Sequence, residues 1–397
     1  MTLFAWQCRL ICALSLLILS PTKILAETDP IKFVSTLSNN EFKLLLDDFA
    51  STTGIPLETI QLDNNKLKGQ LQLVDEEMTI PDAMLVPADF IGLSDIHYSE
   101  IPGSWISGDI KEKDIQTASL NGKVLGIPVI SGNHLVLYYN KTKTTRPAQS
   151  WQEIVNSTKL KKGYQIGWSF NEMYWFIPFL TAFNALPYQV NSTEMQTVDF
   201  NTPQMQQALT FYWQLNSLGV VDDKCIYTCA QKRFRTGDLN YLIDGFWSYH
   251  SLKQQLGDSL GVAPLPTIDG QPMHSYFSVY LIAFPEQALS GPKQAELKRL
   301  IDYFQSYQVQ SRLWNEFGLI PTHKKAFQAL ASMQSANVRV ILNQMASSIP
   351  MPNNPEMAII WEVLFKGFSR YGSGVMDAQR TVSYMQHIAE RSLLHLK

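Results

Sequence analysis

Short apolar runs alternate with stretches of helical periodicity along most of this chain. Residues 31–36 (IKFVST) predict a strand, and residues 40–55 predict a helix whose large apolar residues recur every three or four positions until Gly54 ends it. Further strands are predicted at residues 81–86, 124–131 and 134–141, and further helices begin near residues 150 and 202. A strand–turn–helix unit is predicted over residues 238–257 and a pair of strands over residues 260–284. From residue 292 onward, the chain is predicted to be mostly helical. Strands that alternate with helices indicate an α/β architecture.

Length and charge narrow the class of protein. A chain of 397 residues has room for two domains or one large one. Its net charge of −3 gives no electrostatic basis for binding nucleic acid, which requires a basic face. We therefore expect a globular protein whose partners are not nucleic acids.

The first 26 residues have the pattern of a secretory signal. Arg9 precedes an apolar run over residues 10–19, which is too short to span a bilayer but fits the hydrophobic region of a signal peptide. We expect cleavage near Ala26 and export of the rest of the chain. No later segment has eighteen uncharged apolar residues in succession.

Two cysteines, Cys225 and Cys229, remain after the predicted cleavage. An even pair in an oxidising compartment predicts a disulfide, and one helical turn of separation is within disulfide reach. A metal site is the alternative, but no second cysteine pair or nearby histidine completes it. We expect no metal and no cofactor.

Catalytic motifs are not found in the sequence. The seven histidines form no metal-ligand spacing, and there is neither a nucleophile elbow nor a phosphate-binding glycine loop. The acidic pairs Asp222-Asp223 and Glu76-Glu77 are adjacent in sequence, as in solvated turns. A carboxylate pair drawn from distant segments, as in glycosidases, stays open as an alternative. No catalytic residue is predicted.

A proline-rich loop precedes Trp361 in residues 348–364 (SIPMPNNPEMAIIWEVL). Pro350 and Pro352 favour an extended backbone, and a helical stripe begins at Glu356. The loop either caps a core helix or aims Trp361 at something outside the core.

Several segments, taken together and in order, resemble the periplasmic carbohydrate-type solute-binding proteins of ABC transporters, the family of maltose-binding protein. The matching segments are DDFASTTGI, PDAMLV, NGKVLGIPV with LVLYYNK, SWQEI, EMYWFIPFL, FRTGDLNYLIDGFWSY, GVAPLPTIDGQP and MPNNPEMAIIW. The resemblance implies the two-lobed periplasmic-binding-protein fold, in which hinge strands join the lobes and a ligand is held in the cleft between them. It also implies a non-enzymatic, monomeric protein in the periplasm.

The resemblance implies how the chain is divided between the lobes. The expected N-terminal lobe comprises residues 27–132 and 282–331, and the expected C-terminal lobe comprises residues 135–276 and 337–397. Hinges are expected near residues 132–135, 277–281 and 331–337.

Aromatic residues of the C-terminal lobe are the main candidates for the ligand site. The resemblance places Trp247, Trp361 and Tyr174 at positions that stack on sugar rings, and Glu172 where a carboxylate binds sugar hydroxyls. Each could instead be a packing residue, since Trp247 follows Gly245 and Tyr174 lies in an aromatic-rich stretch.

The other candidate positions depart from the family pattern. Thr36 stands where the pattern has a charged pair, Asp89 keeps only the acid of an Asp-Arg pair, and Asn133 replaces a glutamate. Phe365, one turn after Trp361, replaces an arginine. With fewer charged hydroxyl partners, tight maltose binding is not expected, and a different or less hydroxyl-rich ligand is favoured.

The sequence thus predicts a protein that captures a small solute, most simply a mono- or oligosaccharide, and delivers it to an ABC permease. The alternative keeps the fold but docks the closed form on a sensor kinase or chemoreceptor. A third hypothesis is a secreted glycoside-active enzyme.

Overall fold

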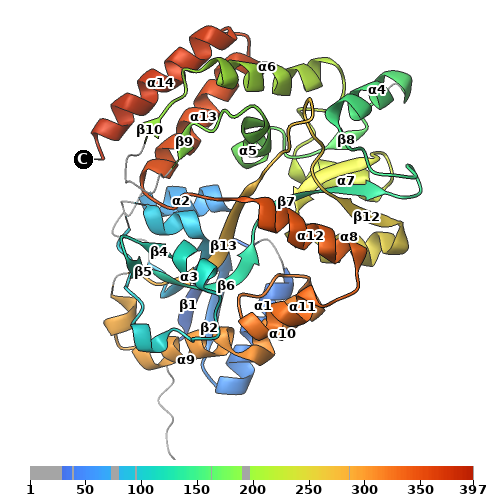
Figure 1. The fold of residues 1–397 in the computed structure, drawn as a ribbon. Helices are drawn as coiled ribbons and strands as arrows, with labels where there is room; N and C mark the ends of the chain where they lie inside the picture. Colours follow the sequence, from blue (N-terminus) through green and yellow to red (C-terminus); the bar gives the residue numbers. More distant parts are fainter. Residues whose placement is uncertain are drawn as a thin grey trace, which may run out of the picture.

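A computed structural model shows a chain folded into two lobes that are stacked one above the other in Figure 1. The structure describes residues 29–37, 40–72, 80–93, 96–161, 163–189, 197–285 and 287–396. The predicted signal peptide and the Glu76-Glu77 pair lie outside the described residues. In the part of the chain that is described, no helix is long and apolar enough to cross a membrane.

The first lobe is built on a six-stranded sheet. Its strands run in the order β14-β13-β3-β1-β2, with β6 also paired to β13. Their bounds are β1 Ile31–Ser35, β2 Leu57–Gln61, β3 Ala83–Pro87, β6 Gly126–Gly132, β13 Tyr276–Ala283 and β14 Ile349–Pro350. β1 is parallel to β2 and β3, whereas β13 is antiparallel to β3 and β6. A strand from late in the chain therefore lies between strands formed early.

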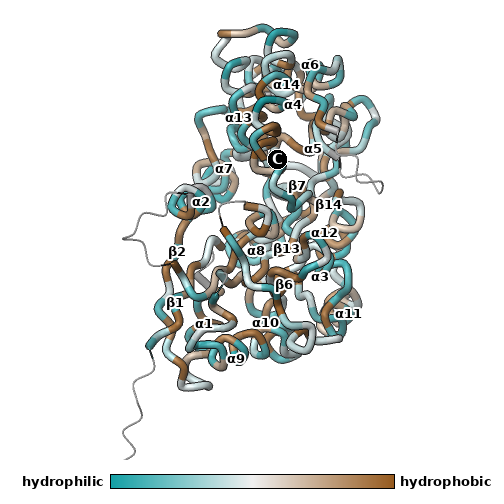
Figure 2. The backbone as a smooth tube through the Cα atoms, turned by 90° about the vertical axis from the view of Figure 1, so that its left-hand side faces the viewer, coloured by the Kyte–Doolittle hydropathy of each residue, from teal (hydrophilic) through white to brown (hydrophobic). Residues whose placement is uncertain are grey.

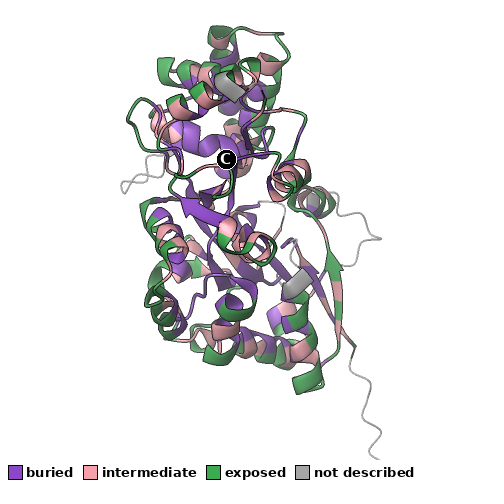
Figure 3. Cartoon of the chain, turned by 90° about the vertical axis from the view of Figure 1, so that its right-hand side faces the viewer, coloured by how far each residue is buried: buried purple, intermediate pink, exposed green. Residues whose placement is uncertain are grey.

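Helices cover this sheet, and the first of them confirms the predicted pattern. The helices are α1 Asn40–Thr53, α2 Asn64–Gln72, α3 Glu112–Thr117, α9 Gln294–Gln305, α10 Tyr307–Phe317 and α11 Lys324–Ala331. In α1, Phe42, Leu45 and Phe49 are all buried, and Gly54 follows with a φ of 71°, the left-handed conformation that commonly ends a helix. Figure 3 shows buried residues along the strands and exposed residues on the outer sides of helices.

The second lobe surrounds a four-stranded sheet of order β12-β7-β11-β8. Its strands are β7 Leu135–Asn140, β8 Ile166–Gly167, β11 Tyr241–Gly245 and β12 Leu260–Ala263. Its helices are α4 Trp151–Lys161, α5 Met173–Ala182, α6 Pro203–Ser217, α7 Tyr227–Arg235, α8 Tyr249–Leu256, α12 Ala336–Ser347, α13 Glu356–Gly372 and α14 Ala378–Leu394. The antiparallel pair α13 and α14 runs along the outside of this lobe (Figure 1).

Short elements complete the fold. They are the strand pairs β4 Ser119–Leu120 with β5 Lys123–Val124 and β9 Tyr188–Gln189 with β10 Thr197–Val198, and the 3-10 turns η1 Ala88–Gly92, η2 Gly103–Trp105, η3 Phe246–Ser248, η4 Gly257–Ser259 and η5 Ala288–Ser290. The two-lobed α/β fold agrees with the fold class predicted from the sequence.

Strand β2 is one element that the sequence pattern does not predict. It lies at the edge of the sheet, and its residues alternate only between intermediate and exposed positions. Because no residue of β2 is fully buried, the strand carries little of the apolar alternation that marks a half-buried strand. Figure 2 shows how hydrophobic residues are distributed along the strands and helices of both lobes.

Several connections link the lobes, among them the segment from α12 through β14 to α13. β6 passes into β7 through Asn133, which has a φ of 42°. Residues 264–275 lead from β12 to β13, and residues 332–335 join α11 to α12. The predicted hinge at residues 277–281 lies within β13, and the hinge positions stay a prediction. The exact lobe boundaries stay a prediction.

Candidate functional site

Trp361 lies on α13 within a cluster of aromatic rings. Its ring centre is 6.0 Å from that of Tyr276 on β13 and 6.5 Å from that of Tyr174 on α5. Trp361 is half-buried, so part of the indole stays open to solvent. Three elements that are distant in sequence therefore form one aromatic cluster at the junction of the lobes, in which Tyr276 is fully buried.

The loop before Trp361 is held against the first lobe. The side-chain amide of Asn353 donates hydrogen bonds to the carbonyl oxygens of Thr117 and Ser119, both at 2.9 Å. The loop also touches η1 so closely that a Cβ added at Gly92 would lie 2.2 Å from the carbonyl oxygen of Asn353. The loop is therefore anchored to the first lobe directly before α13 begins, and the role of Trp361 in the site stays a prediction.

Tyr174 links α5 to the crossing between the lobes. Its hydroxyl donates to the carbonyl oxygen of Asn133, and the carbonyl oxygen of Tyr276 lies 3.2 Å away. Burial raises the pKa of Tyr174 well above its usual value, so the phenol stays neutral at physiological pH. Asn133 itself is buried and takes part through its backbone carbonyl.

Trp247 packs directly over Gly245 at the end of β11. A Cβ at Gly245 would lie 2.1 Å from the indole ring, so a glycine is needed at this position. The indole Nε1 donates to the hydroxyl of Tyr227 at 3.0 Å, and Trp175 meets the Trp247 ring edge-on at 6.3 Å. The half-buried Trp247 is therefore fixed in orientation.

A disulfide brackets the residue that orients Trp247. Cys225 and Cys229 are bonded to each other, which confirms the predicted pair. Tyr227 lies between them and begins α7. The disulfide thus closes a short loop around the hydroxyl partner of Trp247.

Glu172 immediately precedes α5 and has an exposed side chain. Its pKa is raised, first because neighbouring protein partly desolvates the carboxylate and second because the carboxylate of Asp63 is nearby. Asp63 belongs to the first lobe, directly before α2. Glu172 therefore faces across the junction of the lobes.

Polar candidates of the first lobe meet at the carboxyl ends of β1 and β3. Thr36 follows β1 and donates from Oγ1 to the carbonyl oxygen of Leu85 at 3.3 Å. Burial raises the pKa of Tyr280 to about 12, with a smaller contribution from Asp89, whereas the side chain of Thr36 opposes the shift. Ligands of open α/β sheets bind beyond the carboxyl ends of parallel strands, so this cluster lies where a ligand is expected.

Asp89 is not a free carboxylate. Its Oδ2 forms an ion pair with Lys68 Nζ at 2.9 Å, and both side chains are largely buried. The same ammonium lies 4.8 Å from the ring centre of Phe90. The retained acid therefore has a partner within its own lobe.

Phe365, a candidate position from the sequence, lies apart from the aromatic cluster. Phe365 is 54% exposed on α13, and no ring contact of the described residues includes it.

Sequence reasoning missed Tyr276, Tyr280, Tyr227 and Lys68. Tyr276 and Tyr280 share one face of β13, where side chains repeat every second residue. That alternation was a usable signal for the two tyrosines. Tyr227 contacts Trp247 and Lys68 contacts Asp89, and both pairs are about 20 residues apart in the sequence, so no local sequence pattern indicates either contact.

No predicted site residue lines the hollow beside Trp105 and His323 or the hollow beside Phe327 and Val338. Among the described residues, no group of three or more His, Cys, Asp or Glu side chains could hold a metal ion. The geometry is therefore that of an aromatic surface with hydroxyl and amide groups at its edge.

Comparison with known proteins adds independent findings. The family model described as "Bacterial extracellular solute-binding protein" matches residues 45–338. The chain is similar to the maltooligosaccharide ABC transporter solute-binding lipoprotein of Streptococcus pneumoniae R6, with 23% identity covering 78% of this chain and 76% of the relative. It is also similar to the maltodextrin-binding protein MdxE of Bacillus subtilis, with 22% identity covering 71% and 70%.

Proposed function

Because this chain belongs to the bacterial extracellular solute-binding proteins, we propose that it captures a saccharide between its lobes and delivers it to an ABC permease. The relatives named for maltooligosaccharide and maltodextrin make a malto-oligosaccharide the first ligand to test. We further propose that residues 1–26 direct export to the periplasm, and that the exported protein acts as a monomer without enzymatic activity.

The observation that carries this proposal is the aromatic cluster in which the half-buried rings of Trp361 and Tyr174 pack against the buried Tyr276. Sugar rings present weakly polar C–H faces, and aromatic rings offer large contact areas at low entropic cost. Trp247 adds a second indole that Tyr227 holds in place. We propose that the half-buried rings of Trp361, Tyr174 and Trp247 bind the faces of successive sugar units. Tyr276, which is 1% exposed, packs behind Trp361 and Tyr174 and holds them in place.

Polar groups at the edge of this surface would select among hydroxyls. We propose Glu172, Thr36 and Asn133 as hydroxyl-facing positions, and Phe365 as an outer apolar contact one turn beyond Trp361. Asp89 is already paired with Lys68, so a hydroxyl would have to compete with that ammonium. We therefore propose that ring stacking contributes more to affinity than charged hydrogen bonds do.

Calorimetric titration with glucose, maltose, maltotriose and maltotetraose tests the proposal. We expect saturable binding of at least one of them, and a thermal stabilisation that grows with ligand concentration, about 2.7 kcal/mol at a hundredfold excess over Kd. Trp361→Ala and Trp247→Ala should each weaken binding, whereas Leu218→Ala, an exposed residue of the same lobe, should not. Saccharide binding that neither tryptophan variant changes would refute the site.

The non-enzymatic role has its own test. Prolonged incubation with maltotriose should release no new reducing ends. Turnover that disappears in Glu172→Gln would instead support a glycoside-active enzyme.

A further inference from the structure

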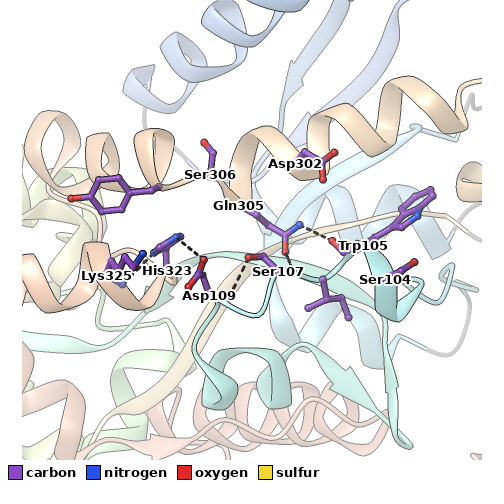
Figure 4. A pocket seen from close by; sticks show the side chains of 11 residues that line it. Ser104, Trp105, Ser107, Asp109, Asp302, Gln305, Ser306, His323 and Lys325 are labelled. Carbon is purple, nitrogen blue, oxygen red and sulfur yellow. Dashed lines mark hydrogen bonds and ion pairs between the residues drawn. The ribbon is translucent and has the colours of Figure 1, made fainter.

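A hollow of about 580 Å³ lies on the first lobe and shares no residue with the site proposed between the lobes. It is formed by the loop around residues 104–109, the junction of α9 and α10, and the start of α11 (Figure 4). Its volume is in the range of small-molecule sites, roughly 300–1,000 Å³. In Figure 4 it is elongated, with Lys325 and His323 towards one end and Trp105 towards the other.

The wall of this hollow is held in place before any ligand binds. The buried amide of Gln305 donates to the carbonyl oxygen of Trp105 at 2.8 Å and accepts from the backbone N–H of Ser107 at 2.8 Å. On the other side, the backbone N–H of Lys324 donates to the carbonyl oxygen of Asp109 at 2.7 Å. The loop is thus anchored at both ends, which lowers the ordering cost of binding.

His323 presents a hydrogen-bond donor to Asp109 without reaching it. Its Nδ1 accepts from the backbone N–H of Lys325 at 3.2 Å, so the neutral ring carries its proton on Nε2. The distance from Nε2 to Oδ2 of Asp109 is 3.9 Å, which is too long for a hydrogen bond. The His323 ring is only 4% exposed. A group that both accepts from Nε2 and donates to the carboxylate would satisfy both residues, and a hydroxyl does so.

The remaining lining residues favour a neutral ligand with apolar faces. Tyr307 is 46% exposed and meets the His323 ring edge-on at 5.5 Å, and Trp105 lines the opposite end. Asp302 forms an ion pair with Lys298, whose ammonium lies 5.8 Å from the ring centre of Trp105. The carboxylate of Asp109 and the ammonium of Lys325 also line the hollow, so neither sign of charge prevails and a neutral ligand is favoured. A metal ion is disfavoured because the proton occupies the Nε2 lone-pair position.

We propose that this hollow is a second saccharide site, which binds a mono- or disaccharide unit independently of the site between the lobes. A sugar hydroxyl would bridge His323 and Asp109, and the ring faces would contact Trp105 and Tyr307. This assignment does not depend on the proposed function of the interlobe site.

Fluorine NMR of protein labelled with 5-fluorotryptophan tests the two sites separately. Trp105, Trp247 and Trp361 are assigned by their Phe variants, and the protein is titrated with glucose and maltose. We expect a saturable shift of the Trp105 resonance that persists in Trp361→Ala. Asp109→Asn should weaken this response at least about tenfold, whereas Asp47→Asn, an exposed carboxylate on α1, should leave it unchanged.

Several outcomes would overturn the second site. The first is a Trp105 resonance that does not shift with sugar while that of Trp247 or Trp361 does. The second is a Trp105 shift that disappears in Trp361→Ala. The third is a Trp105 shift that is unchanged in folded Asp109→Asn. The first of these outcomes would refute the second site and leave the proposed interlobe function intact, so failure of one proposal can be told from failure of the other. If no tryptophan responds to these sugars, the second site is refuted and the interlobe proposal loses them as ligands.

Discussion

The indole Nε1 of Trp247 donates a hydrogen bond to the hydroxyl of Tyr227 at 3.0 Å. Tyr227→Phe removes this acceptor and keeps the ring that packs edge-on against Trp175 at 5.9 Å. Since a neutral hydrogen bond contributes about 1 kcal/mol, we expect saccharide affinity to fall about three- to tenfold. Isothermal titration calorimetry measures this change in affinity. The matched control is Tyr371→Phe, because the Tyr371 hydroxyl makes an exposed hydrogen bond to Thr210. Equal saccharide affinities of the two variants would contradict the role of Tyr227 in orienting Trp247.

The disulfide that surrounds Tyr227 should stabilise the fold modestly. Closing so short a loop contributes about 2 kcal/mol in the chain-entropy model. Replacing Cys225 and Cys229 by serine should therefore lower the free energy of unfolding by about that amount in urea titration. Dithiothreitol should have the same effect on the wild type and none on the double variant. A wild type that is insensitive to reduction would count against this contribution.

Gly92 allows the loop before Trp361 to approach η1. In Gly92→Ala the new Cβ would lie 2.2 Å from a backbone oxygen of Asn353, and backbone cannot move aside cheaply. We expect a loss of about 1–3 kcal/mol in the free energy of unfolding, typical of overpacking. Gly108→Ala is the matched control, because nothing lies within 4 Å of its added Cβ. Thermal melts of the two variants would coincide if the contact were unimportant.

Asp244 should make stability depend on pH in an unusual direction. Burial raises the pKa of Asp244 to about 6, although hydrogen bonds from Gln231 and Ser248 oppose the shift. Because the folded state holds this proton more tightly than the unfolded state does, the stabilising contribution is present below pH 4 and is lost as pH rises through 6. The loss amounts to about 3 kcal/mol.

Urea unfolding at a series of pH values isolates this group by comparing the wild type with Asp244→Asn. The difference in unfolding free energy between the two proteins should change by about 3 kcal/mol between pH 4 and pH 7, in favour of the variant at higher pH. A difference that stays constant with pH would show that Asp244 does not titrate in this range.

Local sequence patterns determined the order of strands and helices, the candidate disulfide and most of the aromatic residues near the lobe junction. The stripe of Phe42, Leu45 and Phe49 became buried, and the β11 turn placed Trp247 over Gly245. These features depend on neighbours within one or two turns of the chain, so their periodicity is visible in one dimension. The edge strand β2 was not predicted, because none of its residues is fully buried and its sequence therefore lacks a clear apolar pattern.

The tertiary structure alone decided which distant residues meet. Tyr174 reaches Asn133 and Tyr276 across 41 and 102 positions, and the Asn353 side chain reaches Thr117 across 236. Such contacts arise from the placement of β13 between early strands, which no local period encodes. The sequence thus specified an α/β solute-binding chain and its aromatic residues. Only the folded chain brought Trp361 to Tyr276, because strand order and lobe packing set distances that sequence spacing does not.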